Sequence, residues 1–260
     1  AGRSSQDVPI MVSLTIETTG TMLVGSEIAA AVNALRSYPI FSLGLNCATG
    51  PKEMTSHIEY LSANWPRRIS CVPNAGLPVL VDGQAHFPLK PEPLAETVGE
   101  FIERYGVDFI GGCCGTTPGH IELLVDQSRK QQRSRRDVSG WTPGCSSLYA
   151  PRDYRQENSF FIVGERMNAS GSRRFKRLLE AGDLDEMISL AREQAREGAT
   201  CLDINVDATG RDNAADMARI VQEVVRQVDV PLMLDSTQPA TIEAGLVHAG
   251  GKCIINSANF

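Results

Sequence analysis

The sequence lacks the features that would place it at a membrane or on nucleic acid. It contains no run of about 18 apolar residues, the length that could cross a bilayer. Its first ten residues, AGRSSQDVPI, lack the basic and apolar regions of a signal peptide. The net charge is −6, so there is no excess of positive charge to attract a phosphate backbone. We therefore predict a cytoplasmic protein that binds neither a membrane nor nucleic acid.

Histidine is scarce, and cysteine is not arranged as a disulfide framework. The four histidines are scattered, which favours surface or helix-cap roles over metal ligation. The seven cysteines are an odd number spread along 260 residues, so metal-binding or buried thiols in a reducing compartment are the better interpretation. Four of them are predicted to be buried or incidental: Cys71, Cys145, Cys201 and Cys253.

Apolar runs of strand length alternate with segments of helical periodicity. This alternation predicts an α/β fold in which helices cover parallel sheets. Before residue 126 the predicted strands are 10–16, 40–46, 68–74 and 107–113. After residue 159 they are 160–165, 200–205, 230–236 and 252–257.

The helix before the second strand of the later set has the clearest signals. Asp183 and Glu186 have capping-box spacing at its start, and Gly198 lies where a C-cap is expected. An apolar stripe runs between them: Leu184, Met187, Ile188, Ala191 and Ala195.

By count alone, the two sets of strands could close into one eight-stranded barrel. A polar stretch at 126–159, with two prolines and two glycines, separates the sets. It is too long for an ordinary barrel loop, so it predicts a structureless linker between domains.

Three cysteines follow predicted strands of the first set. Cys47 ends LGLNC, and Cys113 and Cys114 end FIGGCC. Neighbouring cysteines are too close for a relaxed disulfide, whereas three thiolates suit a zinc ion with one coordination position left open. Such a zinc would hold a substrate thiol as thiolate, which indicates alkyl transfer to sulfur. The alternative, that these are buried small side chains, is about equally compatible with the pattern.

The strands of the second set end in carboxylates, carboxamides and one serine. Side chains of these types can bind the donor and acceptor edge of a planar heterocycle, and an acidic group can accept from an amino-pyrimidine. The alternative for Ser236 is simple N-capping. Asp203 and Asn205 are two apart, on one strand face, which favours a binding role. The candidates are Glu165, Asp203, Asn205, Asp235, Ser236 and Asn256.

These motifs resemble one known family. VSLTI, LGLNCATG, CVPNAGLP and IGGCCGTTPGHI resemble, in that order, the C-terminal half of the homocysteine-binding barrel of the cobalamin-dependent methionine synthases. FIVGERMNASGSRRFKRLL, CLDINVD, PLMLDS and KCIINS are similar to the N-terminal half of the adjacent pterin-binding barrel. The resemblance covers nearly the whole chain, and it favours two incomplete (β/α)8 barrels over one complete barrel.

The resemblance implies a domain organisation and site residues. The homocysteine half-barrel would span 1–130, a linker 131–158, and the pterin half-barrel 159–260. Zinc would bind Cys47, Cys113 and Cys114. Homocysteine would contact Asn74, with Asn46 and Ser13 as weaker candidates. The pterin would lie among Glu165, Asn168, Asp203, Asn205, Asp235, Ser236 and Asn256, with Asn256 and Asp235 in catalytic roles and Asn256 stabilising the protonated methyl donor.

The implied reaction is methyl transfer from 5-methyltetrahydrofolate through cobalamin to homocysteine thiolate, giving methionine and tetrahydrofolate. No cobalamin motif is present in the sequence, so cobalamin would be bound by another domain or protein, and turnover by this chain alone is not expected. One alternative is a pterin-binding module that donates methyl groups to a separate corrinoid protein and has a vestigial or structural zinc site. Another is a single rearranged barrel with a structural zinc.

Overall fold

The computed structural model describes residues 8–139 and 141–257. They divide into two compact units, one ending at Trp141 and the other beginning at Thr142, except that Ala29–Ala34 groups with the second unit. None of the described helices is long and apolar enough to cross a membrane. Each unit is built on its own parallel sheet of four strands.

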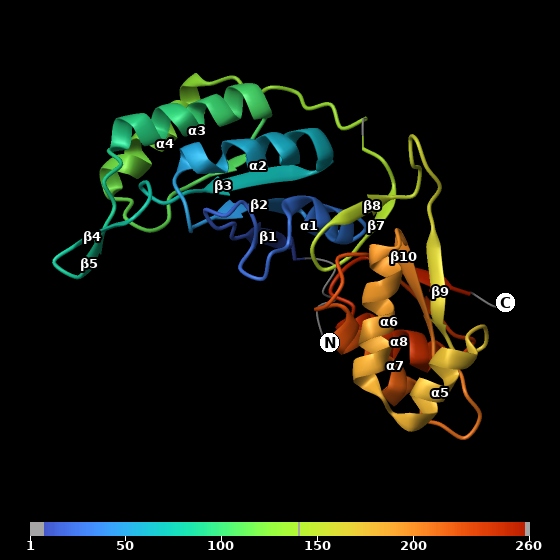
Figure 1. Cartoon of the computed structure of the whole chain (residues 1–260). Coiled ribbons are helices and arrows are strands. Elements are labelled where there is room, and N and C mark those ends of the chain that lie inside the picture. Colours follow the sequence, from blue (N-terminus) through green and yellow to red (C-terminus); the bar gives the residue numbers. More distant parts are fainter. Residues whose placement is uncertain (1–7, 140, 258–260) are drawn as a thin grey trace, which may run out of the picture. The chain divides into compact units, whose positions relative to one another are not determined.

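The first unit contains a parallel sheet in the order β1-β2-β3-β6. Its strands are β1 (Met11–Leu14), β2 (Ser42–Asn46), β3 (Arg68–Val72) and β6 (Phe109–Ile110), and every neighbouring pair is parallel. The helices are α1 (Ile28–Leu35), α2 (Pro51–Asn64), α3 (Pro91–Tyr105) and α4 (Pro118–Lys130), of which α2, α3 and α4 lie along one side of the sheet (Figure 1).

Burial explains why the apolar runs of this unit form central strands. Leu43, Leu45 and Ile69 are buried within β2 and β3, as expected for strands covered on both faces. Proline stands at the start of α2, α3 and α4, where its missing N–H costs no helical hydrogen bond. The four strands predicted from the sequence are therefore confirmed, with shorter bounds.

The second unit repeats this plan in the order β12-β11-β10-β9. Its strands are β9 (Val163–Asn168), β10 (Cys201–Asn205), β11 (Leu232–Asp235) and β12 (Ile254–Asn256), again all parallel. Its helices are α5 (Arg173–Ala181), α6 (Leu184–Arg196), α7 (Asn213–Val224) and α8 (Pro239–His248) (Figure 1). One core joins sheet and helices, including Met167, Ile204 and Leu234 from the strands and Met187 and Val221 from the helices.

Helix α6 begins where the sequence predicts. The Asp183 carboxylate accepts a hydrogen bond of 3.2 Å from the Glu186 backbone N–H, and Gly198 adopts φ = 99° after the helix. Met187 and Ala191 are buried as predicted. The buried face also includes the polar Gln194, which the apolar stripe did not reveal.

Two antiparallel hairpins were not predicted: β4 (Val79–Val81) with β5 (Gln84–His86), and β7 (Gly144–Ser146) with β8 (Pro151–Asp153). Asp82 and Gly83 form the first turn, both with positive φ, as two-residue hairpins require. The second hairpin lies within the stretch predicted to be structureless. That prediction is wrong for this part of the chain, because backbone pairing of β7 with β8 orders it.

The eight predicted strands thus form two separate sheets, each with α/β alternation, and they do not close into one barrel within the described residues. The carboxyl ends of the parallel strands meet at one edge of each sheet, which is where ligands bind in such architectures.

Candidate functional sites

Three cysteine side chains meet at the carboxyl edge of the first sheet. Cys47 follows β2, and Cys113 and Cys114 follow β6. The Cys47 and Cys114 sulfur atoms are 3.7 Å apart, and those of Cys113 and Cys114 are 3.9 Å apart. All three sulfur atoms lie within 4.8 Å of one another. No other group of three or more His, Cys, Asp or Glu side chains in the described ranges has this geometry.

The spacing of the sulfur atoms fits a zinc ion. Tetrahedral coordination with zinc–sulfur bonds of about 2.3 Å places neighbouring ligand sulfurs about 3.8 Å apart. The two measured separations lie on either side of this value. Three thiolates would leave one of the four tetrahedral positions for another ligand.

An unusual backbone conformation directs Cys47 toward the other two thiols. Cys47 and Ala48 both adopt left-handed conformations, with φ of 60° and 56°, which residues other than glycine rarely do. The Cys47 N–H donates to Val72 O over 3.1 Å and so ties this turn to the end of β3. Such conformations cluster at functional sites, where surrounding contacts hold them in place.

Asn74 connects the two cysteine loops. The residue is 3% exposed, and its Oδ1 accepts a hydrogen bond of 3.0 Å from the Cys114 backbone N–H. Its own backbone N–H donates to Thr49 O, two residues after Cys47. Asn74 therefore holds both loops at the thiol cluster. Ser13 and Asn46, also predicted near homocysteine, are hydrogen-bonded to each other over 2.7 Å at the same edge.

A second polar group lies at the carboxyl edge of the other sheet. The strand register pairs Asn205 with Asn168 on one side and Asp235 on the other, and pairs Asp235 with Asn256. The polar row, defined here as Asn168, Asn205, Asp235 and Asn256, therefore contains one residue from each strand.

Hydrogen bonds link Asn168 to both Asp203 and Asp235, and Asn205 to Asp235. Asn168 Nδ2 donates to Asp203 Oδ2 over 2.7 Å and to Asp235 Oδ2 over 3.0 Å. Asn205 Nδ2 donates to the same Asp235 oxygen over 3.1 Å. Amides thus separate two carboxylates that would otherwise repel each other.

Comparisons with known proteins match these two halves separately. Residues 1–128 match the family model described as homocysteine S-methyltransferase, and residues 164–260 match the model described as pterin binding enzyme. The methionine synthases of Mycobacterium tuberculosis (strain ATCC 25618 / H37Rv) and Mycobacterium leprae (strain TN) are 44% and 43% identical to the chain over 99% of its length. The chain is therefore similar to part of the methionine synthases. It spans 22% of the length of each of these relatives.

The solved structures that align with the chain are only distantly similar to it. The carboxyl transferase domain of Rhizobium etli pyruvate carboxylase aligns with a TM-score of 0.31 and 11% identity, covering 97% of this chain and 40% of that chain.

In the first unit, hydrogen bonding shifts the pKa values of two of the three thiols in opposite directions. The pKa of Cys47 is lowered mainly by the hydrogen bond from the backbone N–H of Ala48, while burial acts in the opposite direction. Hydrogen bonds with Cys114, Cys113 and Asn74 lower this pKa further. Hydrogen bonds to Cys47 and Cys113 raise the pKa of Cys114 to about 11. Of Cys47 and Cys114, Cys47 therefore loses its proton more readily.

Asp203 is the most perturbed carboxylate of the second unit. Burial is the main cause that raises its pKa to about 6; the Asn168 hydrogen bond opposes this, and the charges of Asp235 and Glu165 add to it. Asp203 is 3% exposed, and its Oδ1 is buried without a hydrogen-bond partner among the described residues. A buried acceptor of this kind suits a ligand N–H donor.

The remaining predicted pterin residues differ in their surroundings. Glu165 lies on β9 and is exposed. Ser236 is 1% exposed, and its hydroxyl donates to Asp207 Oδ1 over 2.7 Å and accepts from the Gln238 N–H over 3.1 Å. Asp207 was missed from the sequence, although it lies in the same DINVD segment as Asp203. It connects the loop after β10 to the turn after β11.

Proposed function

We propose that this chain contributes a zinc–thiol site and a pterin site to methyl transfer from 5-methyltetrahydrofolate to homocysteine, yielding tetrahydrofolate and methionine. Cobalamin would carry the methyl group between the two sites and would be bound by another domain or protein. In this proposal the two sheets are halves of two (β/α)8 barrels, divided as residues 1–130 and 159–260 with a connecting segment at 131–158, and the protein acts in the cytoplasm.

The spacing of the three sulfur atoms is the observation that carries the proposal. Cys47, Cys113 and Cys114 would bind zinc, which when bound supplies a Lewis acid that keeps the homocysteine sulfur deprotonated at neutral pH. The chain's own contribution is to hold three thiols together before the metal binds. The left-handed turn at Cys47 and the Asn74 hydrogen bond to the Cys114 N–H do this.

For the pterin, Asp203 and the polar row supply hydrogen-bond partners of both kinds. The unpaired Asp203 Oδ1 would accept an N–H from the amino-pyrimidine edge. Asn205 and Asn168 would orient the ring, with Glu165 at its edge. Asn256 would hydrogen-bond the nitrogen that carries the methyl group, and Asp235 would favour its protonation through its negative charge. Ser236 would act by holding its loop.

X-ray absorption at the zinc edge tests the proposal most directly. We expect about one zinc per chain with three sulfur ligands, and a fourth sulfur after homocysteine is added. Cys113→Ser should lose the zinc, whereas Cys71→Ala, at a buried cysteine away from the cluster, should keep it. Zinc whose sulfur count stays unchanged with homocysteine would indicate a structural site and contradict the proposed thiol activation.

A further inference from the structure

Strand β9 contains a bulge directly beside Asp203. Gly164 pairs with Leu202 and Met167 pairs with Ile204, so Glu165 and Arg166 together stand opposite the single residue Asp203. Bulges of this kind occur next to active sites, where they change the direction of a side chain.

The extra residue determines which face of the sheet Asn168 occupies. Side chains alternate between the faces of a strand, so a register shift of one residue exchanges the faces. Without the bulge, Met167 would stand opposite Asn205, and Asn168 would turn toward the helices. With the bulge, Met167 is fully buried in the core and Asn168 joins the polar row.

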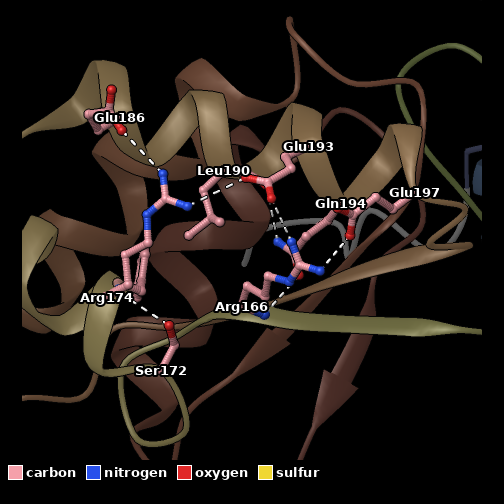
Figure 2. Close-up of polar contacts among 9 residues, drawn as sticks. Arg166, Ser172, Arg174, Glu186, Leu190, Glu193, Gln194 and Glu197 are labelled. Atoms are coloured by element: carbon pink, nitrogen blue, oxygen red, sulfur yellow. Dashed lines mark hydrogen bonds and ion pairs between the residues drawn. The ribbon is translucent and has the colours of Figure 1, made fainter.

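The backbone N–H of Arg166, in the bulge, lies outside the strand ladder. Gln194 of α6 accepts a hydrogen bond from it. The Arg166 N–H donates to Gln194 Oε1 over 2.7 Å, and Gln194 is 3% exposed (Figure 2). A Cβ at Gly164 would lie 2.8 Å from this same oxygen, so glycine at 164 gives the amide room to approach. A backbone N–H outside the ladder is satisfied by a side-chain acceptor of this kind.

The charged groups around this contact are exposed. The Arg166 guanidinium pairs with Glu193 at 2.8 Å and Glu197 at 2.5 Å, all with side chains 43% to 51% exposed. Arg174 of α5 pairs with Glu186 of α6 at 3.3 Å and with Glu193 at 3.5 Å, and these side chains are also exposed (Figure 2). Exposed ion pairs contribute little to stability, so the buried amide is the contact that can fix the backbone.

We propose that Gln194 is a positioning residue for the pterin site: by accepting the Arg166 N–H it holds the β9 bulge and thereby keeps Asn168 in the polar row, bonded to Asp203 and Asp235. The role of this arrangement in binding folate rests on the function proposed above. The positioning itself does not, because it concerns contacts within the second unit.

Gln194→Leu tests the positioning without any ligand. Hydrogen exchange of the Arg166 amide should become about tenfold faster or more, because its acceptor is gone. The Asp203 carboxyl, followed by carbon-13 NMR, should titrate at a higher pH because the Asn168 hydrogen bond that lowers its pKa is weakened. Gln194→Glu, which keeps a side-chain oxygen, should restore both towards the original values.

Two controls separate positioning from a general loss of stability. Glu186→Gln removes the ion pair between Arg174 of α5 and Glu186 of α6, and Val221→Ala removes core volume from α7. Both should leave the Asp203 titration unchanged, even where Val221→Ala lowers the melting temperature. The proposal is overturned if Gln194→Leu also leaves the Arg166 exchange and the Asp203 titration unchanged, or if Val221→Ala shifts them equally.

Calorimetric titration of the full chain with 5-methyltetrahydrofolate tests the functional consequence. We expect Gln194→Leu to weaken binding by roughly tenfold or more, because a displaced Asn168 disturbs the polar row. If the unaltered chain binds no folate while the NMR changes occur, the positioning holds and the proposed pterin function of this chain fails. If folate binding is unaffected by Gln194→Leu, the inferred link to the pterin site is refuted.

Discussion

The Cys47 and Cys114 sulfur atoms lie 3.7 Å apart, although 67 positions separate these residues in the chain. The parallel pairing of β2, β3 and β6 brings their loops to one edge of the sheet, and the left-handed conformation of Cys47 completes the approach. The thiol cluster is therefore a product of the fold of the first unit, and its assembly reports on whether that unit is folded.

Replacing Cys47 or Cys114 by serine should abolish zinc binding. Each substitution removes one of three thiolates, and a serine hydroxyl is a poor zinc ligand at neutral pH. Elemental analysis of protein purified under reducing conditions should give about one zinc for the original chain and close to none for either variant. Cys71→Ala is the matched control, because Cys71 is fully buried and hydrogen-bonds to Met54. Zinc retained by Cys114→Ser would contradict the assignment.

Asn74→Ala should weaken zinc binding without removing a thiol. The substitution leaves the Cys114 N–H without its acceptor, which costs about 1–3 kcal/mol where the group is buried. Loss of a residue that orients metal ligands typically lowers metal affinity by about 10- to 100-fold. Competition with a chromophoric chelator measures this change. Asn74→Asp, which keeps an oxygen acceptor, should bind more tightly than Asn74→Ala; equal affinities would show that the hydrogen bond is unimportant.

The sequence predicted the sheets well because their strands are buried. Apolar runs mark β2, β3, β10 and β11, and proline and glycine mark the helix ends. The β4–β5 hairpin had a sequence signal, the Asp82–Gly83 turn, but its strands are short and exposed. The β7–β8 hairpin had no comparable signal, because its pairing depends on contacts such as that between the Ser146 N–H and Lys252 O, far along the chain.

The site residues could be predicted where they lie at the ends of strands that the sequence itself predicts. Polar residues at the ends of β10 and β11 converge because parallel strands meet at one edge. Spacing alone could not predict that Asn168 lies beside Asp203 and Asp235, since a strand without the bulge would turn its side chain to the opposite face. The bulge resolves this, and the residue that stabilises it, Gln194, is a polar residue in a helix with no local sign of burial.

Asp203→Asn should flatten the dependence of stability on pH. The pKa of Asp203 is about 6 in the folded protein and 3.8 when the group is unperturbed, as in the unfolded chain. The stability that the protonated carboxyl contributes is therefore fully present below about pH 3.8 and is lost as the pH rises through about 6. The loss amounts to about 2–3 kcal/mol for this buried group. Urea unfolding of the second unit, measured between about pH 4 and about pH 7, should show this loss of stability in the original chain and not in Asp203→Asn.

The control for this comparison is Asp185→Asn, which removes an exposed carboxylate of α6. Its stability profile should parallel that of the original chain. An unchanged slope in Asp203→Asn would mean that burial does not raise the Asp203 pKa as stated.

Ser236→Ala distinguishes a loop contact from a ligand contact. The Ser236 hydroxyl is buried between Asp207 and the Gln238 N–H, so its removal should destabilise the second unit by about 1–2 kcal/mol. Asp207→Asn should have a similar effect, because it weakens the same connection between the loops after β10 and β11. If both variants lose stability and folate affinity in parallel, Ser236 acts through the loop. If Ser236→Ala weakens folate binding at unchanged stability while Asp207→Asn does not, the hydroxyl contacts the pterin directly and its bond to Asp207 must break on binding.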